Sequence, residues 1–509
     1  MFRFIVFECG CISAFRSSVI GFFCFFLLFF SVVAAADTYS YWWEPNSQLG
    51  FNDPRKACDY LYSEYYWSHL ISNYRPELNR YRAGVYDCGW NDGVEDGHFG
   101  GAQFTTVDCD IDTSPDRRTK SCSSKAQVGN PIEIASCSNP SSGVGNPLNA
   151  ANGNKYQEEI DFKSGGANPI IISRSYNSLD GVWRHNFSTS LYFGSKTVVL
   201  IGADGRESIF LTDGREYRSS TDSGMLIAQA DGWLYRSSAN IEMYFTSKGY
   251  LSSVTALNGD KYTLTYRHQN ADRAIAIDNG VGVMVELIED PLHQLKALSA
   301  GPKKVAYLYG SRRLLKRATT MGSFVSVREY HYEDSRNNSL LTGITDERGV
   351  RFATWSYDVQ GRAVSSQHGD GAGLTQIAYG EDGASTITNE LGKQTIYRYQ
   401  KISGVKRIVA IEGEPTPDCP ASNSTYTYND RGLVLTKTDA KGLVTTYDYN
   451  DRGLEVSRTE ASGTTLARTT TTEWDPDRFL PIKVIEPNRI TVYSYDNQGR
   501  ELTRQSASR

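Results

Sequence analysis

The stretch YTYNDRGL at residues 426–433 recurs as YDYNDRGL at residues 447–454, 21 positions further along the chain. In both copies two tyrosines stand two positions apart, so their rings lie on one face of a β-strand, where side chains alternate. An asparagine followed three positions later by a glycine is typical of a tight turn. The amide oxygen accepts backbone N–H groups, and glycine adopts a positive φ. Each copy therefore predicts a strand, a turn and a return strand.

Copies of this unit extend over residues 321–509. Further clear copies lie at 355–362 and 493–500, and weaker ones at 330–334 and 473–475. A single hairpin is marginally stable, but stacked hairpins form a continuous sheet. The predicted structural residues of the motif are Tyr357, Asp358, Gly361, Tyr428, Asn429, Gly432, Tyr449, Asn450, Gly453, Tyr495, Asp496 and Gly499.

Residues 146–320 are interpreted as a β-meander domain that precedes the repeats. Asx-Gly pairs separate short alternating runs, and such pairs are the strongest local sign of a β-hairpin. They stand at Asp180-Gly181, Asp204-Gly205, Asp213-Gly214, Asp231-Gly232 and Asn258-Gly259. The loop-like residues 137–145, with their Pro, Gly and Ser content, mark a linker or domain boundary in front of the meander.

The composition favours an all-β protein. Among 509 residues there are 32 Tyr and 45 Gly but only 5 Met. Tyrosine suits pleated, half-buried surfaces, and glycine supplies the turns between short strands. The formal net charge of −5 offers no basic face for a phosphate backbone, so we expect no nucleic-acid partner.

Residues 1–36 have the layout of a Sec-type signal peptide. An apolar run from Val19 to Val33 follows Arg16, and the alanines at 34–36 offer the small side chains that a signal peptidase requires. The mature chain would begin at Asp37, without a membrane span after cleavage. An uncleaved signal anchor is the alternative, because the run approaches the length that spans a bilayer.

Residues 37–140 are interpreted as a small domain rich in cysteine, tyrosine and tryptophan. Six of the 9 cysteines follow the leader, enough for three disulfides in an exported protein, and the sequence leaves their pairing open. A zinc site is the alternative, but no Cys-x-x-Cys pair supports it. The candidate disulfide cysteines are Cys58, Cys88, Cys109, Cys122, Cys137 and Cys419.

Two ligand-binding interpretations of this small domain were weighed against a purely structural one. Its aromatic side chains, among them Trp42 and Trp67, can stack on sugar rings or form the core of the domain, and the core is favoured. The run 108–112 begins like a calcium loop, but Thr113 and Thr119 stand where such a loop has glycine and glutamate. We therefore expect neither a metal nor a cofactor.

The repeat resembles the YD repeat of the Rhs (rearrangement hotspot) family, which includes bacterial wall-associated proteins and the animal teneurins. The stretches NPLNAANGNK at 146–155, RSYNS at 174–178 and WRHNF at 183–187 resemble the domain of uncharacterised function that precedes such repeats. The resemblance implies a sheet of hairpins that spirals into a hollow shell. In bacterial members that shell encloses a variable C-terminal toxin domain, and the repeat residues form its wall.

This chain departs from the family pattern near Arg509, where the closing core motif, the autocleavage aspartate and the toxin domain are missing. The sequence therefore predicts an incomplete shell with an unpaired edge strand, which is an aggregation hazard. Its expected partner is the missing C-terminal toxin or effector, or the remaining shell.

Three functions compete at this point. An exported scaffold, secreted or held at the cell surface, is favoured, and a surface carbohydrate-binding or adhesion module is the alternative. An enzyme such as a glycosidase ranks last: the sequence has no G-x-S-x-G, no phosphate-binding loop and no H-E-x-x-H, and nothing singles out a carboxylate pair. We predict no catalytic residues.

Overall fold

The computed structural model describes residues 140–509 except for 213–216, 270–271, 291–292, 311–312 and 414–422. Before residue 140 it describes only 36–44, 49–51, 57–58, 81–82, 85–91, 96–110, 113–116 and 121–131. Residues 1–35 of the expected leader, together with Cys137 and Cys419, lie outside the described residues. Among the residues described, no helix has the length and apolar character needed to cross a membrane.

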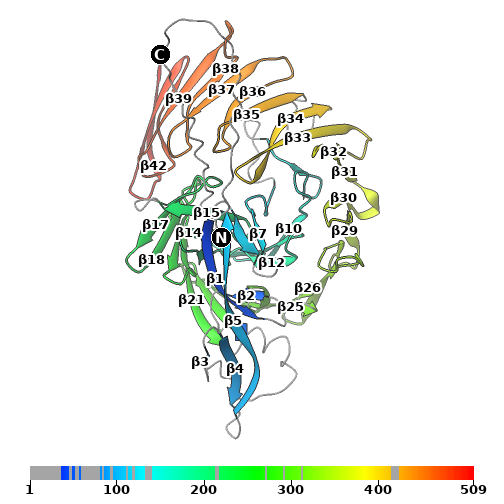
Figure 1. Cartoon of the computed structure of the whole chain (residues 1–509). Helices are drawn as coiled ribbons and strands as arrows, with labels where there is room; N and C mark the ends of the chain where they lie inside the picture. Colours follow the sequence, from blue (N-terminus) through cyan, green and yellow to red (C-terminus); the bar gives the residue numbers. More distant parts are fainter. Residues whose placement is uncertain are drawn as a thin grey trace, which may run out of the picture. The chain divides into compact units, whose positions relative to one another are not determined.

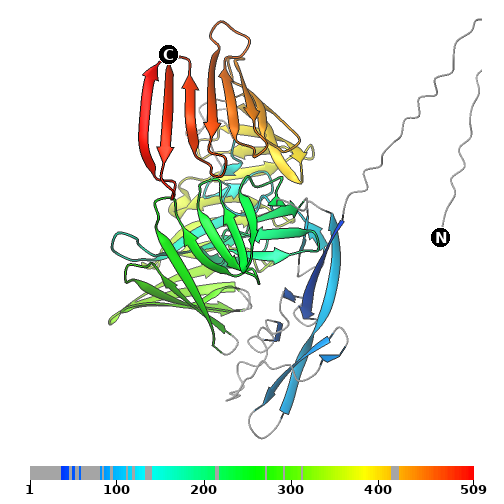
Figure 2. The ribbon, with the colours of Figure 1, turned by 90° about the vertical axis from the view of Figure 1, so that its left-hand side faces the viewer.

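One antiparallel sheet of 30 strands dominates the molecule, and the prediction of an all-β fold is confirmed (Figure 1). Its strands follow one another in chain order from β13 to β42, so each strand pairs with the one before it and the one after it. Figure 2 shows this succession from another side, through green, yellow and red. The sheet is not closed, because β13 and β42 are its two outer strands.

The strands of the large sheet are short and separated by tight turns, as the Asx-Gly and Tyr-Asp patterns predict. They are β13 (Ser190–Phe193), β14 (Thr197–Ile201), β15 (Glu207–Thr212), β16 (Tyr217–Arg218), β17 (Met225–Gln229), β18 (Gly232–Arg236), β19 (Glu242–Thr246), β20 (Leu251–Thr255), β21 (Lys261–Gln269), β22 (Asp272–Asp278), β23 (Met284–Glu289), β24 (Leu295–Ala300), β25 (Lys303–Gly310), β26 (Arg313–Met321), β27 (Phe324–His331), β28 (Gly343–Thr345), β29 (Arg351–Tyr357), β30 (Ala363–His368), β31 (Thr375–Tyr379), β32 (Ser385–Thr388), β33 (Gln394–Ile402), β34 (Val405–Gly413), β35 (Ser424–Tyr428), β36 (Val434–Thr438), β37 (Val444–Tyr449), β38 (Glu455–Glu460), β39 (Arg468–Trp474), β40 (Pro481–Glu486), β41 (Arg489–Tyr495) and β42 (Glu501–Ser508). A 3-10 turn, η2 (Gly369–Gly371), follows β30.

Four small sheets come before the large one. Their strands are β1 (Ala36–Glu44), β2 (Leu49–Phe51), β3 (Tyr81–Arg82), β4 (Val85–Asn91), β5 (Asp96–Asp110), β6 (Ser114–Asp116), β7 (Ser121–Ser123), β8 (Gly143–Val144), β9 (Leu148–Asn149), β10 (Tyr156–Lys163), β11 (Ile171–Asn177) and β12 (Val182–His185). The first five strands form one sheet in the order β2-β1-β5-β4-β3, and β6-β7, β8-β9 and β10-β11-β12 form the others. We call β10–β12 the inner sheet.

The inner sheet packs against the large sheet and forms the core with it. Trp183 and Tyr176 of the inner sheet are fully buried, as is Trp355 of β29. The Trp183 ring lies 5.1 Å from the ring of Tyr330 in β27, edge to face. Tyr176 also donates a hydrogen bond to the carbonyl of Ser339, just before β28. The strands on which the inner sheet packs are thereby held in place.

The two outer strands of the large sheet differ in their surroundings. The backbone N–H groups of Leu191 and Ser195, in and after β13, donate to the carbonyls of Gly249 and Thr38. All eight residues of β42 are exposed, and its pairing within the described chain is with β41 alone. The beginning of the sheet is therefore covered, and β42 presents a free edge.

Candidate functional site

The acidic residue of the repeat motif organises the turn that follows it. Asp358 accepts hydrogen bonds from the backbone N–H groups of Gln360 and Arg362, both at 2.9 Å. Its second oxygen accepts from the Arg362 side chain at 2.7 Å. Asp496 and Arg500 repeat this arrangement, with N–H to oxygen distances of 2.8 Å for the backbone and 2.6 Å for the side chain. The arginine four positions after the aspartate is thus an ion-pair partner.

In the copies that carry asparagine, the amide oxygen takes over the capping of the turn. Asn429 accepts from the N–H of Leu433 at 3.0 Å, and Asn450 accepts from Leu454 at the same distance. All four motif glycines have a positive φ, which an L side chain rarely adopts. They are Gly361 (77°), Gly432 (73°), Gly453 (80°) and Gly499 (87°).

The second aromatic residue of each motif stands at a β-bulge. The pairing register shifts between Ser356 and Tyr357, and the same shift recurs at Tyr428, Tyr449 and Tyr495. A bulge bends its strand and strengthens the local twist, so one bulge per repeat curves the sheet regularly. Period-two alternation does not reveal a bulge, and the sequence pattern gave no warning of it.

The same tyrosines fasten neighbouring strands together through their phenol groups. Each hydroxyl donates to a backbone carbonyl at or near the start of the preceding strand, and burial raises the pKa of each tyrosine, so the phenols stay protonated. These bonds join Tyr357 to Leu341 at 2.6 Å, Tyr428 to Ile408 at 2.5 Å, Tyr449 to Val434 at 2.8 Å and Tyr495 to Pro481 at 2.8 Å. The motif tyrosine therefore connects neighbouring strands in every copy, and in Tyr357 it is also a buried core side chain.

A buried ionic cluster joins the inner sheet to the large sheet. Asp161 of β10 is fully buried and contacts the guanidinium groups of Arg174, from Nη2 at 3.0 Å, and Arg317, from Nη1 at 2.8 Å. It also accepts from the hydroxyl of Tyr307 at 2.7 Å. Burial alone would raise the pKa of Asp161, but the two guanidinium groups outweigh it and hold the pKa below its usual value. The carboxylate therefore stays charged.

The large sheet returns over itself, so that turns 21 strands apart come into contact. Arg218 at the end of β16 donates to the carbonyl of Asp451, which lies between β37 and β38. Arg236 at the end of β18 donates to Asp477, between β39 and β40, at 2.6 Å. Beside it, Asn240 donates to the carbonyl of Phe479 at 3.1 Å and accepts from its N–H at 2.8 Å. We call this line of contacts the seam.

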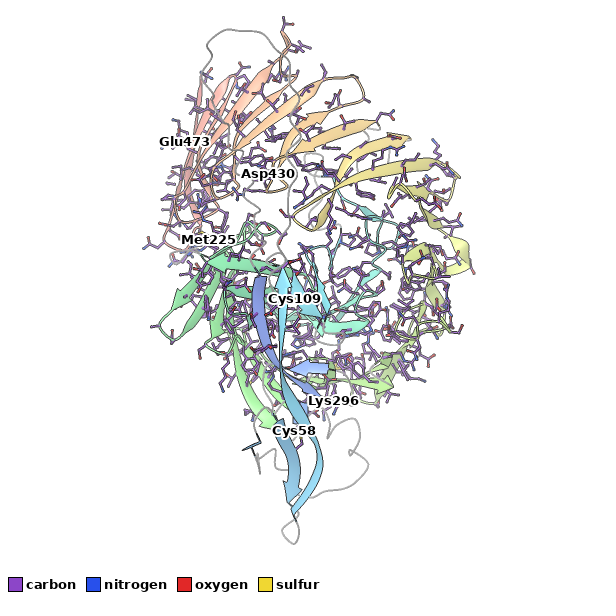
Figure 3. All side chains as sticks on the ribbon, in the orientation of Figure 1. Cys58, Cys109, Met225, Lys296, Asp430 and Glu473 are labelled. Atoms are coloured by element: carbon purple, nitrogen blue, oxygen red, sulfur yellow. A yellow bond between two sulfur atoms is a disulfide. The ribbon has the colours of Figure 1, made fainter. Side chains whose placement is uncertain are left out.

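The segment before residue 140 contains two disulfides. Cys58 pairs with Cys88, and Cys109 pairs with Cys122, and Figure 3 shows Cys58 and Cys109 well apart from one another. The side chains of Trp42 and Trp67, which carried the sugar-binding alternative, lie outside the described residues.

The calcium-like run shows no ion site in its described part. Asp108 accepts a hydrogen bond from the Thr38 hydroxyl at 2.6 Å, while residues 111–112 are not described. Within the described chain, no group of three or more His, Cys, Asp or Glu side chains is placed to hold a metal ion.

Two family models match the chain. The model described as RHS Repeat matches residues 428–465, and the model for the domain of unknown function DUF6531 matches residues 145–210. These are the places where the sequence resembles the repeats and the domain before them, so that resemblance is confirmed. No curated protein matches the chain.

Several solved structures are similar to parts of the chain. A crystal structure titled TcdB2-TccC3 is 12% identical with a TM-score of 0.30, over 79% of this chain and 23% of that one. TcdB2-TccC3-Cdc42 is 13% identical with a TM-score of 0.37, over 60% and 20%. The Tc holotoxin pore of Photorhabdus luminescens is 12% identical with a TM-score of 0.32, over 66% and 19%. The matched parts span about a fifth of the length of these structures.

Proposed function

We propose that this chain, in which an RHS repeat and a preceding DUF6531 domain are matched, forms the N-terminal part of a shell wall. The wall would enclose or display an effector carried by a further C-terminal segment. The observation that carries the proposal is the free edge of β42, which is exposed along its full length. An open strand edge is a template for pairing with another strand.

The seam supports the same proposal. The loops that meet at the seam are always 21 strands apart. One winding of the sheet therefore already rests on the next, at the loops that follow β37 and β39. A wall built in this way gains hydrogen bonds between paired strands and also between successive windings of the sheet. Its residues tie strands together, and within the described part of the chain the motif aspartates have backbone N–H groups and arginines as partners. This is the chemistry of a scaffold.

Hydrogen exchange on the full chain tests the pairing role of β42. We would append a second copy of residues 424–443 after Arg509, so that its strand can pair with β42. A control extension carries proline in place of Thr425 and Thr427 in the added copy, because proline cannot donate to a strand ladder. We expect amide protection in β42 to rise with the first extension and to stay low with the proline control.

Two results would contradict this role. One is β42 amides that exchange as slowly as those of β41 in the unextended chain. The other is equal protection in both extended chains. Sequencing the DNA beyond the codon for Arg509 tests the effector independently: further repeats followed by an unrelated domain support it, and unrelated sequence directly after Arg509 counts against it.

Export is proposed from the leader at residues 1–36. N-terminal sequencing of protein recovered outside the cytoplasm should begin at Asp37. Recovery of the chain only inside the cell, with Met1 retained, would refute cleavage and secretion.

A further inference from the structure

The seam has a third contact beyond those of β16 and β18. Gly499, in the loop after β41, packs on Leu257, in the loop after β20: a Cβ atom added to Gly499 would lie 2.7 Å from the Leu257 Cδ1. The two loops are again 21 strands apart. Figure 2 shows the red end of the sheet next to its green strands. The seam therefore advances two strands at a time, along the loops that follow even-numbered strands.

Where the seam is closed, its apolar side chains are covered. Phe479 and Leu480, in the loop after β39, are each 6% exposed. Asn240 on the opposite loop is also buried, and its side chain bonds both backbone groups of Phe479. Leu257 is half-buried under the following loop. A seam contact thus combines hydrogen bonds to the loop backbone with burial of apolar side chains.

The next loops along the same edge carry exposed apolar side chains. Strands of the large sheet are antiparallel and follow one another in chain order, so the loops after β22, β26 and β28 lie at the edge that the seam already follows. The exposed fractions of their apolar side chains run from 49% for Val350 to 69% for Phe324. We call these side chains, in or beside the three loops, the free rim: Val281, Met284, Met321, Phe324 and Val350.

Single exposed apolar side chains are ordinary on a protein surface. Those of the free rim differ, because they continue the line of loops on which the seam is closed. The space over the loops is open: a Cβ atom added to Gly280, Gly282 or Gly322 would meet no described atom within 4 Å. A row of exposed apolar side chains in such a place is typical of a binding surface.

We propose that the free rim is the docking surface for the motif turns of the next winding of repeat strands. The occupant follows from the seam, because with the same offset the loop after a 43rd strand would meet the loop after β22. The loop after a 47th strand would likewise meet the loop after β26, at Met321 and Phe324. This inference rests on the proposed shell wall, and it identifies the residues of the first winding that receive the second.

The free rim also offers a cation for the polar part of a seam contact. Arg218 and Arg236 donate to the carbonyls of Asp451 and Asp477 in the loops that rest on them. Lys304 is exposed beside the turn after β24, between the two apolar loops, and supplies an ammonium for a loop carbonyl of the next winding. The loops after β22, β24 and β26 therefore together provide both kinds of contact found in the closed seam.

Methionine oxidation by hydrogen peroxide, followed by peptide mass spectrometry, reads the free rim directly. Of the five methionines, Met284 and Met321 belong to the rim, whereas Met225 and Met243 are half-buried in the sheet. The extension by one copy of residues 424–443, which contains no methionine, adds a 43rd and a 44th strand. Met284 should then be oxidised as slowly as Met243, and Met321 should keep its rate in the parent chain. Three copies in tandem should protect Met321 as well.

Two substitutions in the one-copy chain separate docking on the rim from unspecific association. Val281→Lys places an ammonium where the added turn would bury it unpaired, so Met284 should again be oxidised at the parent rate. Val359→Lys is the matched control, because Val359 is 78% exposed in a motif turn at the opposite edge of the sheet. It should leave the protection of Met284 unchanged. In the unextended chain neither substitution should alter the oxidation of Met284.

The outcomes distinguish this inference from the proposed shell wall. If the amides of β42 gain protection in the one-copy chain but Met284 is oxidised at the parent rate, the rim is not the docking surface, although strand pairing at β42 stands. Protection of Met321 by a single copy, or protection of Met284 that survives Val281→Lys, also overturns the inference. If β42 gains no protection, both proposals are wrong. Should the three-copy chain be insoluble, the one-copy chain decides, through Met284 against Met321.

Discussion

The strands β23–β30 and β35–β42 belong to the same sheet, and they carry the same turn motif, but they are buried to different degrees. The first group packs on the inner sheet, and its Tyr357 is 5% exposed. The second group has the motif copy with Tyr495, which is half-buried, and ends in a fully exposed strand. Both tyrosines still donate to a carbonyl of the neighbouring strand. The motif therefore sets strand and turn geometry, and the residues before the large sheet supply the burial.

The largest expected effect lies in the ionic cluster that only the first group possesses. Asp161→Asn leaves the fully buried Arg174 without a carboxylate, and breaking such a pair costs about 3–5 kcal/mol. Asp496→Asn is the matched change in the second group, where Arg500 is 58% exposed, and it should cost under about 1 kcal/mol. Urea unfolding followed by tryptophan fluorescence measures both. If both variants lost the same free energy of unfolding, the buried ionic cluster would not stabilise the first group more than the exposed ion pair stabilises the second.

Acid should weaken the first group more than the second. The pKa of Asp161 is lowered in the folded state, because two guanidinium groups outweigh its burial, so its contribution to stability is present above the unfolded pKa of about 4. That contribution is lost as the pH falls through the folded pKa. Glu455 of β38 has the opposite sign: burial raises its pKa, so its contribution is present in acid and lost on raising the pH.

Hydrogen exchange at pH 6 and pH 3, corrected for the intrinsic rates, checks this prediction. Protection should fall further in β23–β30 than in β35–β42. A uniform fall across both groups, or a larger fall in β35–β42, would show that the buried cluster does not determine the acid response.

The sequence predicted the local chemistry of the repeats well, since each turn depends on residues four positions apart or fewer. Asn429 and Gly432 occupy the turn that their spacing indicated, and the two tyrosines of each copy share a face. The motif also contains both Asp358 and Arg362, which form an ion pair, but the sequence analysis did not identify the arginine as the partner of the aspartate.

What the sequence did not reveal depends on contacts between distant residues. Arg174 and Arg317, the partners of Asp161, lie 13 and 156 positions away from it in the sequence. Asn240 and Phe479, which contact each other at the seam, are 239 positions apart. Neither pair follows a period, so no pattern search would find it. The bulges were missed because one extra residue shifts the apolar–polar alternation by a single position, and the sequence alone does not distinguish this shift from the end of a strand. The sheet's curvature and its seam both follow from these features.

Removing one phenol hydroxyl compares the two groups more finely. Tyr357→Phe leaves the buried carbonyl of Leu341 without its donor at 2.6 Å, which should cost about 1–3 kcal/mol. Tyr495→Phe frees the carbonyl of Pro481 in a half-buried site that water can reach, so we expect about 0.5–1 kcal/mol. Urea unfolding of the two single variants gives the difference. If Tyr495→Phe proved the more costly, burial would not govern the strength of these ties.

The smallest expected effect concerns the arginine of the motif. Arg362→Gln and Arg500→Gln both remove an ion pair with an aspartate four positions earlier, and exposed pairs of this kind contribute about 0–1 kcal/mol. Arg362 also lies 4.1 Å over the ring of Tyr379 in β31, and the described residues show no such ring contact for Arg500. Its loss should therefore come to about 1 kcal/mol, and that of Arg500 should be close to zero.

Thermal unfolding in low and high salt separates the two contributions of Arg362. Salt screens the ion pairs, so the difference between each variant and the parent should shrink for both arginines. The part that Arg362 owes to its packing on the Tyr379 ring should persist in high salt. If the two variants became indistinguishable in high salt, the Tyr379 ring would add nothing to this turn beyond charge, and the burial contrast between the two groups would not extend to the motif arginine.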